Sequence, residues 1–222
     1  GIALGVVAGF LVSQIGFRRL LLVALAGGAL ISLYQATLPP LPLMLLSRIL
    51  EGFSHLIIVV AAPTLMAAVA SDGARGAVMG LWGTFFGVGF ALMSVAENLL
   101  GTGLYWIHAG LLAAVGAAIA PILPRGVARG PAVAEGWLER HVAIYTSPRR
   151  FAPALMFFWH ALMFLSLITF LPETLGGWTA PVLPLVALVG TFAAGAATRR
   201  VAPDRLAIAA FLTGAGLILL FW

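Results

Sequence analysis

Three ionisable side chains, Arg48, Glu51 and His55, lie within one of the most apolar stretches of the sequence. Each residue of an α-helix advances by about 100°, so the three side chains share one face and Glu51 can pair with Arg48 at i,i+3. A guanidinium suits recognition of a carboxylate or another anion, whereas a carboxylate and an imidazole can exchange protons. The spacing therefore predicts a substrate-binding or proton-coupling site. The alternatives are a fixed Arg48–Glu51 pair that holds helices together, or an arginine that reaches the outer interface.

A further histidine, His160, lies midway along another apolar stretch. It is a candidate site residue, and the alternative is an imidazole packed against a neighbouring carbonyl. Gln35 lies near the end of an apolar segment, so we expect water to contact it. His108 adjoins Tyr105 and Trp106, and such a trio is typical of an aromatic belt at the membrane interface.

The composition places these residues in a membrane protein. Of the 222 residues, 62% are hydrophobic and 9% are charged, whereas about a quarter of the residues of a soluble domain are charged. The chain has no cysteine, so disulfides and thiolate metal sites are excluded. The sequence also lacks zinc-hydrolase, Walker and nucleophile-elbow motifs. We therefore expect neither an enzyme nor a protein that holds a cofactor or a metal.

Apolar runs long enough to cross a membrane recur along the chain, each crossing needing about 20 residues. Glycine and proline punctuate almost every break between the runs. The pattern predicts an all-α, polytopic transmembrane helix bundle. Both ends of the sequence lie inside apolar runs, so we expect a fragment of a longer protein. The eight visible segments are residues 1–15, 20–38, 43–70, 77–100, 104–123, 151–172, 179–198 and 206–222.

The arginines predict the orientation of this bundle. There is no lysine, and all the arginines except Arg48 lie in alternate loops, whereas loops 39–42, 101–103 and 173–178 have none. By the positive-inside rule the arginine-bearing loops are cytoplasmic, in an integral, multi-pass protein of the plasma (inner) membrane. Because the basic residues mark one membrane face, we expect no nucleic acid partner. The loop arginines are Arg18, Arg19, Arg75, Arg125, Arg129, Arg140, Arg149, Arg150, Arg199, Arg200 and Arg205.

A long loop, residues 124–150, separates a first part of the chain, residues 1–123, from a second part, residues 151–222. Apolar residues recur within the loop at helical spacing, among them Trp137 and Tyr145. This pattern predicts a short amphipathic helix on the cytoplasmic surface, or else a disordered linker. The flanking parts are predicted to be the partial N-terminal and C-terminal halves of one helix bundle.

Four glycines are predicted helix-packing positions. Gly80, Gly83 and Gly87 recur at three- and four-residue spacing, and Gly52 lies on the ionisable face described above. Glycine has no side chain to hold two helices apart, so helix backbones can approach closely at such positions.

The stretch GFLVSQIGFRR, residues 9–19, resembles the signature loop of the major facilitator superfamily of secondary transporters. Ser13 stands where that family has an acid, and Gln14 stands where it has an arginine. The charge relay of the family's loop is therefore not implied here. The glycine and basic positions of the loop are Gly9, Gly16, Arg18 and Arg19.

A second motif, RILEGFSH, resembles the family's fourth-helix motif through Arg48 and Gly52. The long loop, residues 124–150, resembles the family's central linker. The resemblance implies that the chain covers helices two to nine of a twelve-helix transporter. The segment of His160 would then be the seventh helix, which faces the central cavity in this family.

The resemblance implies transmembrane transport of a small solute by alternating access, by a permease that is functional as a monomer in the lipid bilayer. The ionisable residues favour proton-coupled symport, with a small organic anion as the solute. The family's antiporters carry a Gly-Pro pair in the fifth helix, and here Val88 replaces the proline, which argues against drug–proton antiport. Two other classes remain open: a non-transporting membrane scaffold or sensor, and an intramembrane enzyme.

Overall fold

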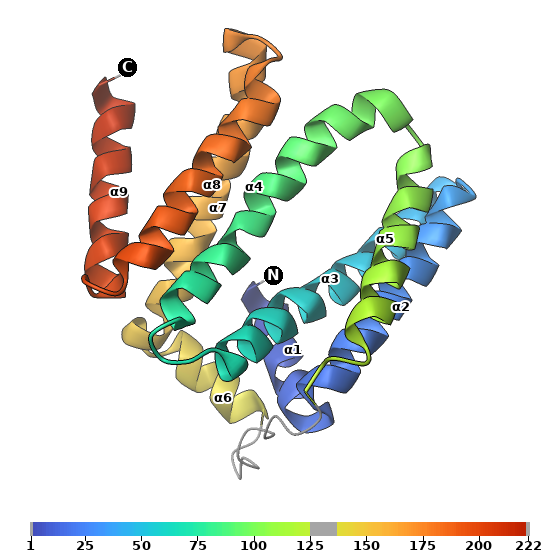
Figure 1. Ribbon diagram of the computed structural model, residues 1–222, viewed down its shortest axis with the longest axis horizontal. Helices are drawn as coiled ribbons and strands as arrows, with labels where there is room; N and C mark the ends of the chain where they lie inside the picture. Colours follow the sequence, from blue (N-terminus) through green and yellow to red (C-terminus); the bar gives the residue numbers. More distant parts are fainter. Residues whose placement is uncertain (1, 125–136, 221–222) are drawn as a thin grey trace.

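The computed structural model describes residues 2–124 and 137–220, and within these ranges it contains helices and no strand. The predicted all-α fold is therefore confirmed. The helices form an open bundle in which successive long helices run in alternating directions (Figure 1). They are α1 (Ile2–Ile15), α2 (Phe17–Ala36), α3 (Leu41–Val69), α4 (Arg75–Leu100), α5 (Gly103–Ile119), α6 (Trp137–Tyr145), α7 (Pro148–Leu175), α8 (Thr179–Ala197) and α9 (Pro203–Leu220).

Each of the eight predicted segments contains one helix, with ends shifted by a few residues. Six of these helices are long and apolar enough to cross a membrane, whereas α1 and α5 are shorter. The helix α7 begins at Pro148, earlier than predicted. A proline is tolerated there, because the N–H groups of a helix's first turn have no partner within the helix, so the N–H that proline lacks is not missed. The loop at residues 124–150 contains the nine-residue helix α6, and residues 125–136 of that loop lie outside the described residues.

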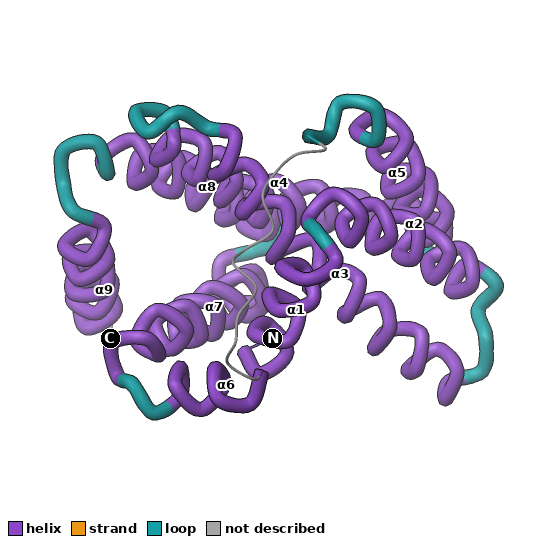
Figure 2. The backbone as a smooth tube through the Cα atoms, turned by 90° about the horizontal axis from the view of Figure 1, so that it is seen from below, coloured by secondary structure: helices purple, strands orange, loops and turns teal. Residues whose placement is uncertain are grey.

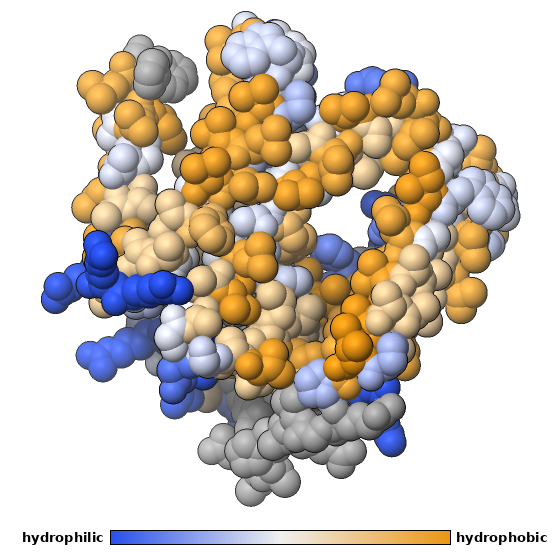
Figure 3. Space-filling view, viewed as in Figure 1, coloured by the Kyte–Doolittle hydropathy of each residue, from blue (hydrophilic) through white to orange (hydrophobic). Residues whose placement is uncertain are grey.

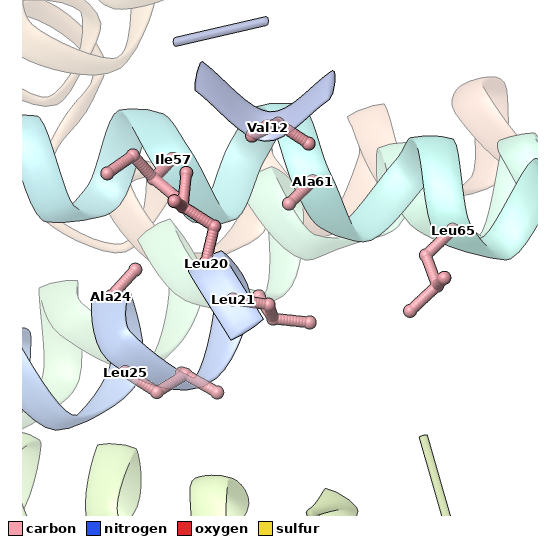
Figure 4. Packing of buried hydrophobic residues seen from close by; sticks show 8 residues of the cluster. All are labelled: Val12, Leu20, Leu21, Ala24, Leu25, Ile57, Ala61 and Leu65. Carbon is pink, nitrogen blue, oxygen red and sulfur yellow. The ribbon is translucent and has the colours of Figure 1, made fainter. Parts of the chain in front are cut away.

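The first part of the chain packs around a small apolar core. Buried side chains of α1, α2 and α3 gather there (Figure 4), and Leu112 and Ile119 of α5 pack against them. Ser54 of α3 adds a buried hydrogen bond, because its hydroxyl donates to the backbone carbonyl of Ala24 in α2 at 2.6 Å. These four helices therefore form one packed body.

The helices α4 and α8 lie side by side and run in opposite directions (Figures 1 and 2). A Cβ added at Gly80 would lie 3.0 Å from the Cα of Gly195, and one added at Gly87 would lie 2.5 Å from the carbonyl oxygen of Pro184. Gly83 lies between them and faces α8 in the same way. The two helices can approach this closely only because these positions of α4 carry no side chain. We call this contact, made by residues 76–87 and 184–198, the α4–α8 seam.

Most of the visible surface is apolar. Figure 3 shows hydrophobic residues over the lengths of the helices and strongly hydrophilic residues gathered toward one end of the bundle, near the turn between α8 and α9. Within the described part of the chain, α7 and α9 bury none of their residues. A surface of this kind suits a protein surrounded by lipid, in which helices satisfy their own backbone groups. Together with the six candidate spans, it supports an integral, multi-pass membrane protein.

Candidate functional site

Polar side chains from three helices of the first part meet near one end of the bundle. Ser32 and Gln35 come from α2, Arg48 and Glu51 from α3, and His108 from α5. A short turn joins α2 to α3, and α5 packs along α2, so residues far apart in the sequence become neighbours. We call these five residues the Glu51 cluster.

The carboxylate of Glu51 lies at the centre of this cluster. Its Oε2 accepts a hydrogen bond from Gln35 Nε2 at 3.0 Å and pairs with Arg48 Nη1. Its Oε1 lies 3.4 Å from His108 Nδ1. The Glu51 side chain is only 13% exposed. An anionic carboxylate at this depth is stabilised by two cationic or ionisable partners and one amide donor.

The prediction that water contacts Gln35 is wrong. Its side chain is fully buried, because α3 and α5 both pack against the end of α2. The amide links two charges: Nε2 donates to Glu51, and Oε1 lies 3.5 Å from Arg48 Nη1 as the acceptor. Gln35 therefore fixes the position of both charged groups.

His108 is shared between two partners. Its Nδ1 lies 2.6 Å from the hydroxyl of Ser32, which is fully buried, as well as 3.4 Å from Glu51. A hydroxyl can donate to a bare nitrogen and accept from a protonated one, so Ser32 suits either protonation state of the imidazole. Sequence reasoning assigned His108 to an aromatic belt and did not single out Ser32. The three-residue spacing of Ser32 and Gln35 marks a polar face at the end of α2, but only the packing of α5 shows its partner.

Arg48 and Glu51 differ in their exposure. The Arg48 side chain is 56% exposed, more than four times the fraction of its partner. The bonds to Glu51 and Gln35 use Nη1, whereas a guanidinium carries five N–H donors. Donors therefore remain for a further anion on the exposed side of Arg48.

The remaining residues of the predicted ionisable face point elsewhere. His55 lies one turn beyond Glu51 on α3 and is exposed. Gly52 is also exposed, and an added Cβ would meet no described atom within 4 Å. No helix of the described part of the chain approaches Gly52. Its role in helix packing therefore stays a prediction.

His160 is not part of the Glu51 cluster. It lies exposed on α7, and its ring stacks on Phe164 at 6.3 Å between centroids. Phe164 in turn contacts Phe90 of α4 edge to face at 5.8 Å. His160 therefore lies beside an aromatic contact between the first and the second part of the chain.

The predicted signature loop forms the bend between α1 and α2. Gly16 adopts φ 101°, a conformation that favours glycine. The guanidinium of Arg18 crosses to α5, where Nη2 donates to the carbonyl of Ala120 at 2.7 Å. This carbonyl lies at the C-terminal end of α5, where a cation also interacts favourably with the helix dipole. Arg19 is exposed, and a Cβ added at Gly9 would meet no described atom within 4 Å.

The arrangement of the Glu51 cluster can hold charge and exchange protons. In the ranges 2–124 and 137–220 no group of three histidine or acidic side chains is placed to hold a metal ion. The cluster instead combines one fixed cation, one carboxylate, one imidazole and two neutral hydrogen-bonding groups. A proton can therefore reside on the carboxylate or on the imidazole.

A comparison with protein families adds to this geometry. Residues 1–222 match the family described as the Major Facilitator Superfamily. No curated protein and no solved structure matches the chain.

Proposed function

The chain belongs to the Major Facilitator Superfamily of membrane transporters, and we propose that it moves a small solute across the membrane by alternating access. In this process a site between two halves of a bundle opens first to one side and then to the other. The observation that carries the proposal is the α4–α8 seam, which joins the first and second parts of the chain. Its glycines give α4 a nearly flat contact surface, over which α8 can shift without separating interlocked side chains.

The proposed orientation follows from the arginines. The starts of α2, α4, α7 and α9 carry Arg18, Arg75, Arg149 and Arg205 within or beside them. We place these ends in the cytoplasm of a cell whose plasma (inner) membrane holds the protein. The Glu51 cluster then lies toward the outer face, and the transporter acts as a monomer.

The proposed solute is a small organic anion. Arg48 supports this choice, because its exposed guanidinium retains donors beyond those bound to Glu51 and Gln35. A carboxylate fits such a planar fork through two parallel hydrogen bonds. His160 is the candidate binding residue of the second part of the chain, since it lies beside the aromatic contact between α4 and α7.

We further propose that a proton gradient drives the transport, which makes the protein a symporter. Glu51, with His55 on the same helix, supplies the groups that exchange protons. The competing class is a membrane scaffold or sensor, which would tolerate apolar replacement of Arg48, Glu51 and His55. An intramembrane enzyme would need further acidic or histidine side chains that meet the Glu51 cluster.

Uptake by proteoliposomes of the purified protein tests the proposal. The probes are radiolabelled acetate, lactate, succinate and benzoate, with a proton gradient imposed. We expect Arg48→Gln to lower uptake of the transported probe about tenfold or more, because it removes charged hydrogen bonds. The matched control is Arg200→Gln, which changes an exposed arginine beyond α8 and is expected to keep wild-type uptake. Wild-type protein that moves none of the probes would contradict organic anion transport, and unchanged uptake by Arg48→Gln would remove Arg48 from the binding site.

A further inference from the structure

We infer that α6 lies in the membrane interface and binds anionic phospholipids of the leaflet nearest to the start of α7. An apolar stripe of α6, made by Leu138, Val142 and Tyr145, enters the leaflet, and Arg149 and Arg150 bind lipid phosphate groups. The inference goes beyond the proposed transport and does not depend on it.

The stripe consists of apolar side chains that the bundle leaves uncovered. Leu138 is 60% exposed, Val142 is 53% exposed and Tyr145 is 38% exposed. Their spacing of four and three residues places them within an arc of about 60° on one face of the helix. Ala143 and Ile144 lie on other faces and are half-buried, so α6 turns a different side toward α7 and α1. An apolar face of this kind marks an interaction surface.

The position of α6 identifies lipid as the partner of this face. The helix lies toward one end of the bundle in Figure 1 and at its outer edge in Figure 2. A ring contact between Tyr145 and Phe151, with centroids 5.5 Å apart, attaches it to the first turn of α7. The 28 residues of α7 form a candidate membrane span. At about 1.5 Å per residue this helix is longer than the hydrocarbon core of about 30 Å, so its start reaches the lipid headgroups.

A short, closed turn holds α6 at this depth. Only Thr146 and Ser147 separate the end of α6 from the start of α7. The hydroxyl of Thr146 donates to the carbonyl of Val142 at 2.6 Å, and the carbonyl of Ser147 accepts from the backbone N–H of Phe151 at 2.9 Å. Because these bonds close the turn, α6 cannot move far from the headgroup level without disturbing the start of α7.

The charges near α6 favour anionic lipids over neutral ones. Arg149 and Arg150 lie in the first turn of α7 and are exposed. Residues 137–150 and 199–205 together contain six arginines but only two acidic residues, Glu139 and Asp204. A guanidinium binds a phosphate through two parallel hydrogen bonds, and basic clusters at a membrane surface attract anionic headgroups. Further exposed arginines lie in and just after the turn between α8 and α9, whose hydrophilic surface is visible in Figure 3: Arg199, Arg200 and Arg205.

The stripe and the arginines support each other in membrane binding. A single apolar contact holds a surface segment only weakly, whereas an apolar contact together with a basic patch gives stable anchoring. When the stripe is inserted, the arginines of the first turn of α7 are near the phosphate groups. Lipid binding by α6 therefore holds the start of α7 at the membrane surface.

Spin labels on the purified protein in liposomes of phosphatidylcholine and phosphatidylglycerol test the insertion. Since the chain has no cysteine, Leu138→Cys and Val142→Cys each carry a single label. We expect oxygen, which dissolves in lipid, to relax both labels more strongly than a nickel chelate, which stays in water. At the exposed Glu139→Cys, the matched control on the polar side of α6, we expect the reverse order. Stronger relaxation by nickel at the stripe, or protection of both stripe labels from both reagents by a protein partner, overturns the inference.

Binding of the two lipids to the purified protein, followed by native mass spectrometry, tests the charge. Each arginine near an anionic surface gives roughly a fivefold gain in binding, so Arg149→Gln combined with Arg150→Gln should lower the affinity for phosphatidylglycerol about tenfold or more. Binding of phosphatidylcholine should not change. The control Arg75→Gln replaces an arginine already paired with Asp72 at 3.0 Å and should keep the wild-type affinity.

Two results of the lipid titration overturn the inference. One is an unchanged affinity of the double arginine variant for phosphatidylglycerol. The other is equal affinity of the wild-type protein for the two lipids, which decides the question even if the double variant does not fold.

Discussion

Two regions of the molecule are held together in opposite ways. One is the body formed by α2, α3 and α5, and the other is the α4–α8 seam. In the first region, side chains interlock: Ser54 bonds to the backbone of α2, and the Glu51 cluster joins three helices through charges and amides. In the second region, glycines bring backbone against backbone, as at Gly80 and Gly195. The first kind of contact is directional and fixes relative position, whereas the second gives close packing without such bonds.

This difference assigns the two regions different tasks in the proposed transport. In that proposal, directional bonds make α2, α3 and α5 a rigid body that carries the proposed proton site. The seam, in which α4 presents few side chains, is the proposed place of movement between the two parts. Changes to the two regions should therefore have different consequences for stability and for motion.

The largest effect on stability is expected from Glu51→Ala in the rigid body. It leaves Arg48, Gln35 and His108 without their shared anion, and the loss of a hydrogen bond to a charged group costs about 1.5–3 kcal/mol. The free energy of unfolding in detergent micelles measures this loss. Replacing Arg48 and Glu51 together by methionine is the matched control and should recover most of the stability. Equal losses in the single and the double variant would show that the loss does not come from leaving Arg48 without its anion.

The next largest effect is expected at the seam. A Cβ at Gly195 would lie 2.5 Å from the Cα of Gly80, so Gly195→Ala must push the helices apart. Overpacking of this kind costs about 1–3 kcal/mol, and we expect it to slow solute exchange as well. Gly190→Ala on the same helix is the control, because its Cβ would meet no described atom within 4 Å. Exchange and stability that are the same in both variants would contradict a tight seam.

A smaller effect is expected where α2 meets the end of α5. Arg18→Gln removes the charged donor to the Ala120 carbonyl, which should cost about 1 kcal/mol in stability. Arg19→Gln changes the exposed neighbour and should leave the unfolding transition almost unchanged. Thermal melting of the two variants side by side measures the difference. A lower melting temperature for Arg19→Gln than for Arg18→Gln would contradict the predicted contact.

The local pattern of the sequence predicts much of this fold. The lengths of the apolar runs locate the helices, because each crossing requires a long apolar run. The three-residue spacing of Arg48 and Glu51 predicts a pair within one helix, and the pair is present. The spacing of Gly80, Gly83 and Gly87 predicts a close helix contact but does not identify α8 as the partner.

The polar partners of Glu51 could not be predicted, because they depend on which helices touch. Gln35 and His108 lie near helix ends, where local pattern favours contact with water or with the interface. Packing of α3 and α5 against α2 buries Gln35 and brings His108 to Glu51 instead. At Gly52 the local pattern errs in the opposite direction. A glycine there suits close packing of a neighbouring helix, but no described helix lies against it.

The central claim is that the seam moves while the first body stays rigid. Distances between pairs of spin labels test this claim most directly. The chain contains no cysteine, so labels can be attached at introduced cysteines alone. One pair, at the exposed Leu99 and Val182, joins α4 to α8 beyond the seam. A second pair, at the exposed Val23 and Val115, lies within the first body on α2 and α5. We predict that acidification with the transported carboxylate present changes the distance distribution of the first pair and leaves that of the second pair unchanged. An unchanged first pair, or an equal change in both pairs, would contradict the account.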